Sequence, residues 1–481
     1  MARSSCETGP REPDRARTGR AVVVGASMAG LLAARVLADH VDQVVLVERD
    51  VLPAAAEHRR GLPQGRQFHA LLARGRAVVE DLIPGYSEEL RTAGGVRLRL
   101  PTDVIVLGPA GWMDRRARGW EAVSATRPLI EAVVRRRVLE LPVVTLLEGH
   151  EVTSLTAARD GRSVTGVTVR RVDDGGTTDL DADLVVDAAG RGSRAPAWLA
   201  GLGYPAPARE QVDPKLAYAA RLFQVPAGFS ADWTAVMLTS APPTVARFGY
   251  LFPVEGDQWM VSLMGAGGQH PPTDEAGWTA FVRSLRPPVI AECIASAEPT
   301  SPIRGHHGTT NRRWRFDRMP DWPERFLVVG DAVTAFNPVY GQGMTMAAIA
   351  AETLGACLRA HRGTHRPGDL DGLAVRFQRA LARVEAPAWT LSTSEDLRYP
   401  TTTGMPAGRG QRVRHWYQDR VGSAATVDPV VADVYARVLG MLDPPSALLR
   451  PRVLAGALRA RTGAGPAAPP PPRPAVRTTP R

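Results

Sequence analysis

The segment AVVVGASMAGLLAARVLADHVDQVVLVERD, residues 21–50, constrains the fold more than any other part of the chain. It predicts a buried strand, a turn of small residues, a helix and a second strand that ends at Glu48. A nucleotide pyrophosphate binds bare N–H groups at a helix N-terminus, small residues let it approach, and an acid after the second strand binds a ribose. The segment offers all three features and predicts a nucleotide site. The simpler alternative is a turn that only packs a helix on a sheet.

Glu48 and Ser27 refine this prediction. A carboxylate at position 48 repels a 2′-phosphate, so the adenosine half of FAD or NAD fits better than that of NADP. The turn GASMAG departs from the G-x-G-x-x-G pattern at its middle position. There Ser27 adds a hydroxyl that can bond a phosphate but narrows the approach.

A second strand–loop–helix unit, RFLVVGDAVTAFNPVYGQGMTMAAIAAETL, covers residues 325–354. Asp331 follows the strand and is suited to bind a polyol hydroxyl. Gly341 and Gly343 precede the helix and leave its first N–H groups open to negative charge. An electron-rich ring such as the pyrimidine of a flavin would be stabilised there. The competing interpretation is an ordinary capped helix with an apolar stripe, in which Met344 packs in the core.

Length, composition and charge limit the class of protein. A chain of 481 residues exceeds what one core supports, and 44% hydrophobic with 22% charged residues is typical of a folded globular enzyme. The net charge of +10 resides at the ends, because 1–20 carry +2 and 444–481 carry +7, which leaves +1 for 21–443. A near-neutral body has no electrostatic footprint for nucleic acid, so none is expected as a partner of the folded part. Binding of nucleic acid or membrane by the tails is the alternative to solvated tails.

Cysteine usage and hydropathy favour the cytoplasm. Cys6, Cys293 and Cys357 lie far apart and form no CxxC pair, so neither a disulfide framework nor a metal site is expected. The N-terminus has no apolar signal region, and no run reaches about eighteen apolar residues. We therefore expect a cytoplasmic protein without stable membrane insertion.

Short apolar runs rich in Val predict buried parallel strands at 21–25, 44–48, 184–190 and 326–332. Helices are expected over 28–39, 69–83, 127–138, 343–361 and 370–395, with further helices to about 460.

The region 204–310 alternates apolar and polar residues, which predicts antiparallel strands with one covered face. Its aromatic residues are candidates for the wall of an apolar pocket, although simple core packing is the alternative. These residues are Phe248, Tyr250, Phe252 and Trp259.

Three segments in this order resemble the FAD-contacting motifs of flavoprotein monooxygenases of the para-hydroxybenzoate hydroxylase fold: GASMAG with Glu48, LVVDAAGRGS, and GDAVTAFNPVYGQGM. More narrowly, residues 59–75, 124–138 and 311–344 resemble the actinobacterial FAD-dependent epoxidases of polyether polyketide biosynthesis. The resemblance covers most of the folded chain.

The resemblance implies an α/β fold with a Rossmann-like FAD-binding domain, an inserted antiparallel-sheet substrate domain and a helical C-terminal part. The expected divisions are a disordered tail over 1–19, an FAD-binding domain built from 20–100, 124–203 and 311–365, a substrate-binding sheet domain built from 101–123 and 204–310, a helical part over 366–460, and a Pro- and Arg-rich disordered tail over 461–481.

The resemblance also assigns cofactor residues. It places Gly25, Ser27, Met28, Ala29 and Gly30 along the FAD pyrophosphate, Glu48 on the adenosine ribose with Arg49 beside it, Arg127 near the phosphates or ribityl chain, Asp331 on the ribityl chain, and Gly341, Gln342, Gly343 and Met344 along the isoalloxazine edge. His69 is a further candidate for contact with the flavin, with a helix-capping histidine as the alternative. No catalytic side chain is assigned, and Arg59, Arg60 and Arg66 are either partners of the diphosphate or solvated loop residues.

The implied activity is that of a monooxygenase that transfers one oxygen from O2, through a flavin C4a-hydroperoxide, to an apolar natural-product-like substrate. Alkene epoxidation is favoured over aromatic hydroxylation because no base for a phenolic proton is identified. The expected partner is a hydrophobic small molecule: a polyketide, an isoprenoid or an aromatic compound.

One departure from the family concerns the electron donor. Where aromatic hydroxylases carry DGxxSxxR, this chain has Ala189-Gly190-Arg191-Gly192-Ser193 and then Pro196 in place of the final Arg. Electrons are therefore expected from transient NAD(P)H binding or from a separate flavin reductase.

Three other classes use the same scaffold or cofactor. A prenyl-chain reductase would pass hydride from the flavin to a double bond, and a non-catalytic flavin-binding partner protein would show no turnover. A flavin-dependent halogenase would carry WxWxIP and an active-site lysine, but that motif is absent and Lys215 is the one lysine in the sequence.

Overall fold

The computed structural model describes residues 19–460, except 367, 407 and 409, together with residue 470. The tails expected over 1–19 and 461–481 therefore lie outside the described residues, apart from Gly19 and Pro470, and so does Cys6.

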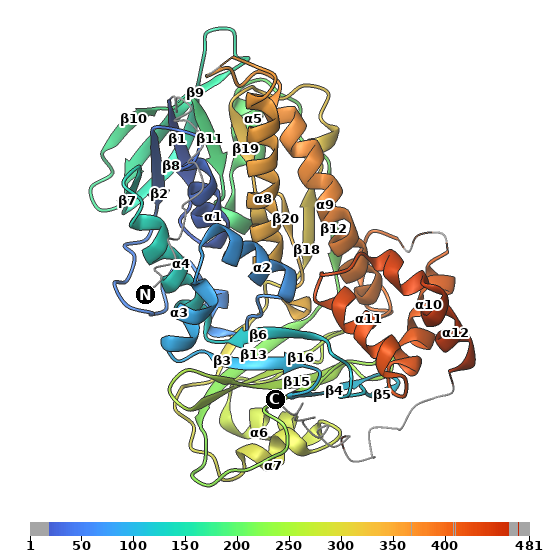
Figure 1. The fold of residues 1–481 in the computed structure, drawn as a ribbon. Helices are drawn as coiled ribbons and strands as arrows, with labels where there is room; N and C mark the ends of the chain where they lie inside the picture. Colours follow the sequence, from blue (N-terminus) through green and yellow to red (C-terminus); the bar gives the residue numbers. More distant parts are fainter. Residues whose placement is uncertain (1–18, 367, 407, 409, 461–469, 471–481) are drawn as a thin grey trace, which may run out of the picture.

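A five-stranded parallel sheet forms one half of the molecule (Figure 1). Its strands, in spatial order, are β19 (Phe326–Val328), β11 (Leu184–Asp187), β1 (Arg20–Val24), β2 (Gln43–Glu48) and β7 (Val144–Glu148). Four of the five are the Val-rich runs of the sequence, so the prediction that these runs share a parallel sheet is confirmed. The fifth, β7, was not predicted because its VTLLE sequence is mostly half-buried or exposed and carries no strong apolar pattern.

Helices cover one face of this sheet and a small antiparallel sheet covers the other, with the main core between the layers. The helices are α1 (Met28–Leu37), α2 (Ala73–Leu82), α4 (Arg127–Leu139), α8 (Gly343–Arg362) and α9 (Leu373–Asp396), with the short α3 (Tyr86–Thr92) and α5 (Ala195–Gly201) nearby. The small sheet has the order β10 (Thr177–Asp181), β9 (Val164–Arg171), β8 (His150–Ala157).

The helix expected over 69–83 begins four residues late, at Ala73. The preceding segment is held in an irregular path by distant hydroxyls. The N–H of Phe68 donates to Ser262 Oγ at 3.3 Å, and the N–H of Leu72 donates to Thr345 Oγ1 at 3.0 Å. His69 therefore lies in a loop and not at a helix start.

A seven-stranded sheet forms the other half of the molecule (Figure 1). In spatial order it contains β17 (Arg304–His306), β13 (Ala217–Gln224), β16 (Gln258–Gly265), β15 (Arg247–Val254), β14 (Ala235–Leu238), β4 (Val104–Gly108) and β5 (Gly111–Trp112). All neighbours are antiparallel except β14 and β4, which are parallel. Helices α6 (Glu275–Ser284) and α7 (Val289–Ile294) cover the face that points away from the parallel sheet.

Smaller elements join the two halves. A four-stranded sheet contains β20 (Thr334–Ala335), β18 (Asn311–Trp314), β12 (Arg209–Asp213) and β21 (Thr403–Gly404), and a two-stranded sheet contains β3 (Val96–Leu100) and β6 (Trp120–Ser124). The C-terminal helices α10 (Gln411–Ala424), α11 (Pro429–Leu439) and α12 (Pro451–Arg459) pack around their own apolar cluster.

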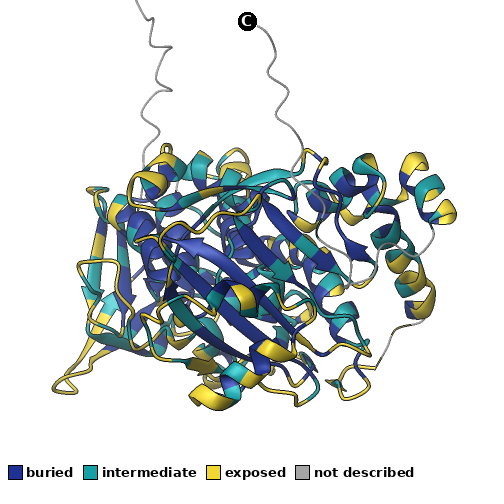
Figure 2. Ribbon diagram, turned by 90° about the horizontal axis from the view of Figure 1, so that it is seen from below, coloured by how far each residue is buried: buried dark blue, intermediate teal, exposed yellow. Residues whose placement is uncertain are grey.

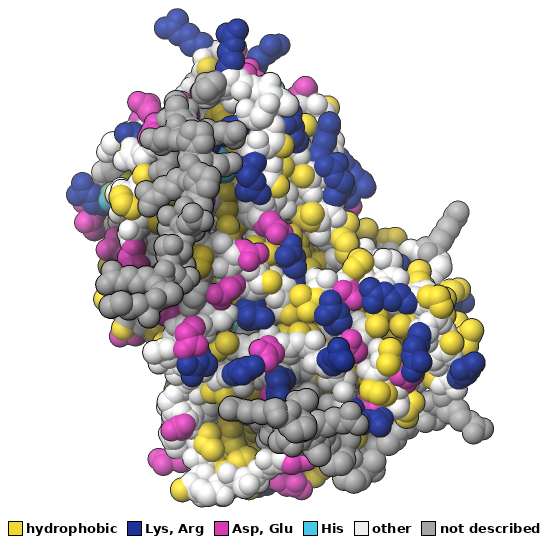
Figure 3. Space-filling view, viewed as in Figure 1, with side chains coloured by type: hydrophobic (Ala, Val, Ile, Leu, Met, Phe, Trp, Pro, Cys, Tyr) yellow, Lys and Arg dark blue, Asp and Glu magenta, His cyan; other side chains and the backbone are white. Residues whose placement is uncertain are grey.

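Burial follows this layered arrangement. Figure 2 shows buried residues along the strands and exposed residues on the outer sides of the helices. On the face shown in Figure 3, basic and acidic side chains are interspersed, in keeping with the near-neutral charge of 21–443. None of the helices within the described ranges is long and apolar enough to cross a membrane.

Candidate functional site

The first candidate element is the turn between β1 and α1. Gly25 has φ +96°, which favours glycine, and a Cβ there would lie 2.8 Å from the carbonyl oxygen of Ala188. Helix α1 begins at Met28, and the Ser27 side chain does not cap it, so the first helical N–H groups remain available to a ligand. Gly30 faces the other way. A Cβ there would lie 1.8 Å from the Gly25 carbonyl oxygen, so Gly30 allows the helix to pack closely on the turn.

Glu48 lies at the end of β2 and is bound to the same turn. Its Oε2 accepts the N–H of Ala26 at 2.8 Å, and its Oε1 accepts the N–H of Asp50 at 3.0 Å. The guanidinium of Arg59 lies 3.2 Å from Glu48 and 3.3 Å from Asp50. The carboxylate is thus fixed at the strand end, where a ribose would meet it.

A buried carboxylate, Glu131 on α4, lies next to the pyrophosphate turn. Its Oε2 accepts hydrogen bonds of 2.8 Å from Ser27 Oγ and from Arg127 Nη2, and its Oε1 accepts one of 3.0 Å from Arg59 Nε. Burial alone would raise the pKa of Glu131, but the charges of Arg127 and Arg59 outweigh it and hold the pKa below the ordinary value. Glu131 is therefore ionised at neutral pH.

One buried N–H donor beside this turn, the Nε of Arg127, has no acceptor among the described residues. The side chain of Arg127 is 6% exposed, yet its Nε has no hydrogen-bond partner among the described residues. A buried guanidinium N–H without a partner is costly, and an anionic group would satisfy it. Arg127 and the open turn therefore fit a phosphate, as FAD would supply.

The second candidate element meets the first at Gly330. This residue follows β19 with φ +62°, and a Cβ there would lie 2.7 Å from the Cβ of Ala29. A glycine at this position thus lets the two strand ends approach each other. Asp331, the next residue, lies 3.8 Å from Arg191 Nε through its Oδ2. Burial raises the pKa of Asp331, and Arg191 opposes that effect.

The loop before α8 provides a second open helix start. Gly341 has φ +65°, α8 begins at Gly343, and the first turn of this 20-residue helix contains no acidic residue. A Cβ at Gly343 would have no described atom within 4 Å, so this face is open. Gln342 is buried, and its Oε1 has no partner among the described residues.

The middle motif shapes the wall between these elements. Asp187, at the end of β11, is fully buried and accepts bonds from Ser193 Oγ at 2.5 Å and from the Ala189 N–H at 2.9 Å. Burial raises its pKa to about 6. These bonds fix the turn that carries Arg191, whose guanidinium donates to the carbonyl oxygens of Thr310 and Phe336 at 2.8 and 2.7 Å.

His69 remains neutral in this setting. Burial, reinforced by the charge of Arg127, lowers its pKa to about 3. Its Nδ1 lies 2.9 Å from the carbonyl oxygen of Gln67, which places the proton on Nδ1 and leaves Nε2 as an acceptor.

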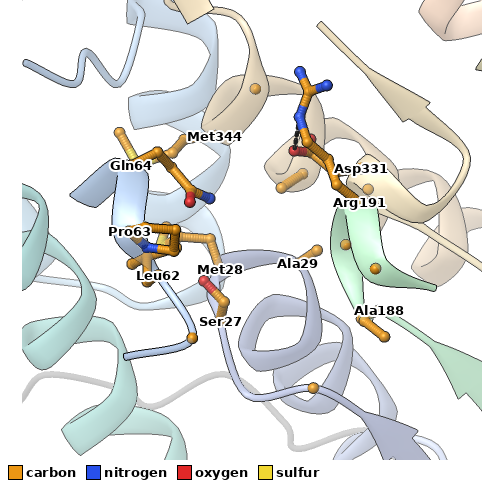
Figure 4. A pocket seen from close by; sticks show the side chains of 18 of the residues that line it. Ser27, Met28, Ala29, Leu62, Pro63, Gln64, Ala188, Arg191, Asp331 and Met344 are labelled. Carbon is orange, nitrogen blue, oxygen red and sulfur yellow. Dashed lines mark ion pairs between the residues drawn. The ribbon is translucent and has the colours of Figure 1, made fainter. Parts of the chain in front are cut away.

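These elements enclose one cavity of about 510 Å³. In Figure 4, Leu62, Pro63 and Gln64 lie across the cavity from Asp331 and Arg191, with Ser27, Met28 and Ala29 between them. The candidate residues that line it are Gly25, Ser27, Met28, Ala29, Glu48, Arg49, His69, Arg127, Asp331, Gly341, Gly343 and Met344. Gly30 and Gln342 are not lining residues.

Several lining residues were missed or left open by sequence reasoning. Arg191 lines the cavity. Arg59 also lines it and is paired with carboxylates instead of being solvated. Arg60 and Arg66 are exposed. Glu131 does not line the cavity but binds Ser27, Arg127 and Arg59, which do, and it was missed although its position four residues after Arg127 on a predicted helix was a usable signal. No cluster of three or more His, Cys, Asp or Glu side chains suited to a metal occurs in the described part of the chain.

An aromatic cluster adjoins the cavity on one face of the seven-stranded sheet. Phe248, Tyr250 and Phe252 belong to it, and Phe68 stacks on Phe252 with ring centroids 4.2 Å apart. Phe68 also lines the cavity, so it connects the two regions. For Trp259 the alternative of core packing holds, because that residue lies on the opposite face, in the cluster covered by α6 and α7.

Comparisons with known proteins agree with this arrangement. The model of the FAD binding domain family matches residues 19–372. Protein Rv3254 of Mycobacterium tuberculosis (strain ATCC 25618 / H37Rv) is 35% identical over 451 residues, which cover 91% of this chain and 94% of that protein.

Solved structures share the fold at low identity. The flavin-dependent brominase Bmp2 has a TM-score of 0.62 and 14% identity, over 87% of this chain and 92% of that one. PqsL from Pseudomonas aeruginosa, described as a probable FAD-dependent monooxygenase, has a TM-score of 0.55 and 17% identity, over 80% of this chain and 98% of that one.

Proposed function

Because this chain belongs to the FAD binding domain family, we propose that it is an FAD-dependent monooxygenase that inserts one oxygen atom from O2 into an apolar substrate. Epoxidation of an alkene is the proposed reaction, with a polyketide or isoprenoid as substrate class. The resemblance of residues 59–75, 124–138 and 311–344 to polyether epoxidases supports this choice.

The observation that carries the proposal is the single cavity shared by two strand-end sites. One site has an open helix start, the unpartnered Nε of Arg127 and the fixed carboxylate of Glu48, which suit a diphosphate and a ribose. The other has Asp331 and the open start of α8, which suit a ribityl chain and an electron-rich ring. A dinucleotide with a ring at one end matches both sites at once.

Bound and reduced FAD would supply the two electrons that activate O2, and one atom of that O2 would be transferred to the substrate while the other leaves as water. The chain would contribute orientation and exclusion of water. Phe68 lines the cavity and stacks on Phe252 of the aromatic face. An apolar substrate held against that face would therefore meet the flavin ring in an environment from which water is excluded. Burial raises the pKa of Tyr250 above its ordinary value, so its hydroxyl stays protonated and can donate to a substrate oxygen but cannot serve as a base.

The structure also bears on the alternatives. Lys215 is exposed and is not among the lining residues of the cavity, which disfavours a halogenase despite the fold shared with Bmp2. Aromatic hydroxylation benefits from a base that removes the phenolic proton, and the lowered pKa of His69 makes its Nε2 a weak base for that step. Reduction is proposed to come from a separate flavin reductase or from NAD(P)H bound transiently.

The decisive experiment combines cofactor analysis with isotope labelling. Purified protein should be yellow and release FAD on denaturation. With a flavin reductase, NAD(P)H and ¹⁸O2, a panel of polyenes and phenols should yield a product that carries one labelled oxygen. Turnover without O2 would indicate a reductase instead, and FAD that reoxidises at its free-solution rate with no product would indicate a non-catalytic flavin protein.

A further inference from the structure

A buried network of hydrogen bonds connects the end of helix α9 with the loop that precedes α8. Asp396, the last residue of α9, accepts bonds from Asn311 Nδ2 at 2.5 Å, from Asn337 Nδ2 at 3.1 Å and from Tyr340 Oη at 2.7 Å. Asn311, Asn337 and Asp396 are each at most 1% exposed. The Oδ1 of Asn311 in turn accepts the N–H of Asn337 at 2.7 Å, so the loop is held through both side chain and backbone.

The residues next to these anchors point to two different regions. Pro338 and Gly341 line the cofactor cavity, whereas Val339 packs against the aromatic cluster of the seven-stranded sheet. The loop therefore separates the cavity from the aromatic face. The side chains of Asn337 and Tyr340 bind this loop to Asp396. A shift of Asp396 would move both of these surfaces together.

We propose that Asp396 is a positioning residue for the bound cofactor: it holds the Asn337–Gly341 loop, through Asn337 and Tyr340, at the place where the flavin ring would bind. This inference rests on the proposed function. It assigns a role in the cofactor site to α9, whose last residue lies beyond the matched family region of 19–372.

The network needs an acceptor at position 396. The amide groups of Asn311 and Asn337 and the hydroxyl of Tyr340 all donate to the carboxylate, so a protonated acid or an amide would place a donor against donors. Buried donors left without an acceptor are costly, so the loop would move to satisfy them.

Protonation of Asp396 should therefore be visible at the flavin. Burial raises the pKa of Asp396 to about 7, against the bonds from Tyr340, Asn337 and Asn311. The titratable groups that face it are Glu395 on its own helix, Tyr340 on the loop, Tyr399 after the helix and Tyr218 on β13. Burial raises the pKa values of all three tyrosines and also that of Glu395, and Asp396 is the member of this group whose pKa is raised to about 7.

The test compares Asp396→Asn with Glu395→Gln. The carboxylate of Glu395 lies 2.9 Å from Arg398 and makes no bond to the loop among the described residues, so its substitution is the matched control. Dissociation constants for FAD are measured by flavin fluorescence, and visible absorption spectra of the bound flavin are recorded from pH 5.5 to 8.5. Thermal unfolding without FAD is measured in parallel.

Asp396→Asn is expected to weaken FAD binding by at least about tenfold, to shift the flavin absorption bands and to remove a spectral change centred near pH 7. Glu395→Gln should leave the flavin bands at their parental positions and keep the spectral change, with its midpoint moved to lower pH because the Glu395 charge helps to raise the pKa of Asp396. Tyr340→Phe should shift the bands in the same direction by a smaller amount, and its effect should vanish when combined with Asp396→Asn.

A folded Asp396→Asn variant with the parent spectrum and affinity would overturn the inference while leaving the proposed function intact. If Asp396→Asn does not fold, Tyr340→Phe decides, and an unchanged flavin spectrum in that variant overturns the inference. A parent protein that binds no FAD would overturn the proposed function and this inference together.

Discussion

Replacing Glu131 with Gln should strengthen FAD binding, although Glu131 is buried and fully engaged. Its carboxylate accepts hydrogen bonds of 2.8 Å from Ser27 Oγ and from Arg127 Nη2. These are the donors that a diphosphate would use. The ordinary expectation for a buried, hydrogen-bonded residue is loss of function. The charge of the site predicts the opposite sign.

The size of the effect follows from these distances. A phosphate oxygen that replaces Glu131 as the acceptor of the Ser27 hydroxyl, at about 2.8 Å, would lie at most about 5.6 Å from the Glu131 carboxylate oxygen, which lies 2.8 Å from the same Oγ. At an effective dielectric constant of about 20, two unit charges at that separation repel by about 3 kcal/mol. Part of this gain is offset by poorer orientation of Arg127 and Arg59. We therefore expect FAD to bind roughly 10- to 100-fold more tightly, or about 1.4–3 kcal/mol.

The assay is titration of apoprotein with FAD, followed by flavin fluorescence and by thermal unfolding with and without FAD. Apo Glu131→Gln should unfold at a lower temperature than the parent, because two buried arginines lose a charged partner. Its stabilisation by FAD should be larger. Glu140→Gln, on the same helix but in an exposed pair with Arg136, is the matched control and should change neither value. Weaker FAD binding by folded Glu131→Gln would refute the reasoning and show that Glu131 serves to orient Arg127.

Four further substitutions test the cavity and its surroundings. Gly330→Ala combines φ +62° with a clash against Ala29, so it should lower the free energy of unfolding by about 1–3 kcal/mol, measured by thermal unfolding. A Cβ at Gly343 would have no described atom within 4 Å, so Gly343→Ala should leave the stability of the apoprotein unchanged and weaken FAD binding. Equal behaviour of the two variants would contradict this geometry. Asp331→Ala should raise the dissociation constant for FAD by about 1–3 kcal/mol, and retention of FAD at parental affinity would displace Asp331 from the ribityl chain. Burial raises the pKa of Glu385 from 4.5 to about 8, so the folded state holds this proton longer than the unfolded chain does. The stability that the proton provides is complete below pH 4.5 and is lost as pH rises through 8. Between pH 5 and 8.5, the free energy of unfolding of Glu385→Gln, measured with denaturant, should therefore rise relative to that of the parent by more than about 1.4 kcal/mol. Parallel pH profiles of the two proteins would contradict this prediction.

The predicted residues that the structure brings together around one cavity are mostly those whose placement local structure specifies. The turn at Gly25–Gly30, Glu48 and the loop before α8 each belong to one continuous strand–turn–helix unit, where spacing alone fixes which atoms face the ligand. Glu131 escaped because its partners Ser27 and Arg59 lie 104 and 72 residues away, and Asp396 because its partners lie 56 to 85 residues away. Contacts between residues so distant in sequence depend on how layers pack, which no local pattern encodes.

The separation of Trp259 from the other aromatic residues has a simple geometric origin. Side chains alternate between the two faces of a strand, and β15 pairs with β16 so that Phe252 is opposite Met260 and Tyr250 opposite Ser262. Trp259 therefore falls on the other face. Composition identified the aromatic strands, but only the register between them determines which rings share a side.

The position of Asp396 has a consequence for where this protein can be divided. A fragment that ends at residue 372, the limit of the matched family region, retains Asn311 and Asn337 but loses the acceptor that satisfies both. During synthesis the ring end of the cavity can be completed only after α9 has left the ribosome and docked, some sixty residues behind the loop it supports. We therefore expect helix α9 to be part of the same folding unit as the loop it supports, and not an appendage that can be exchanged or trimmed at a domain boundary.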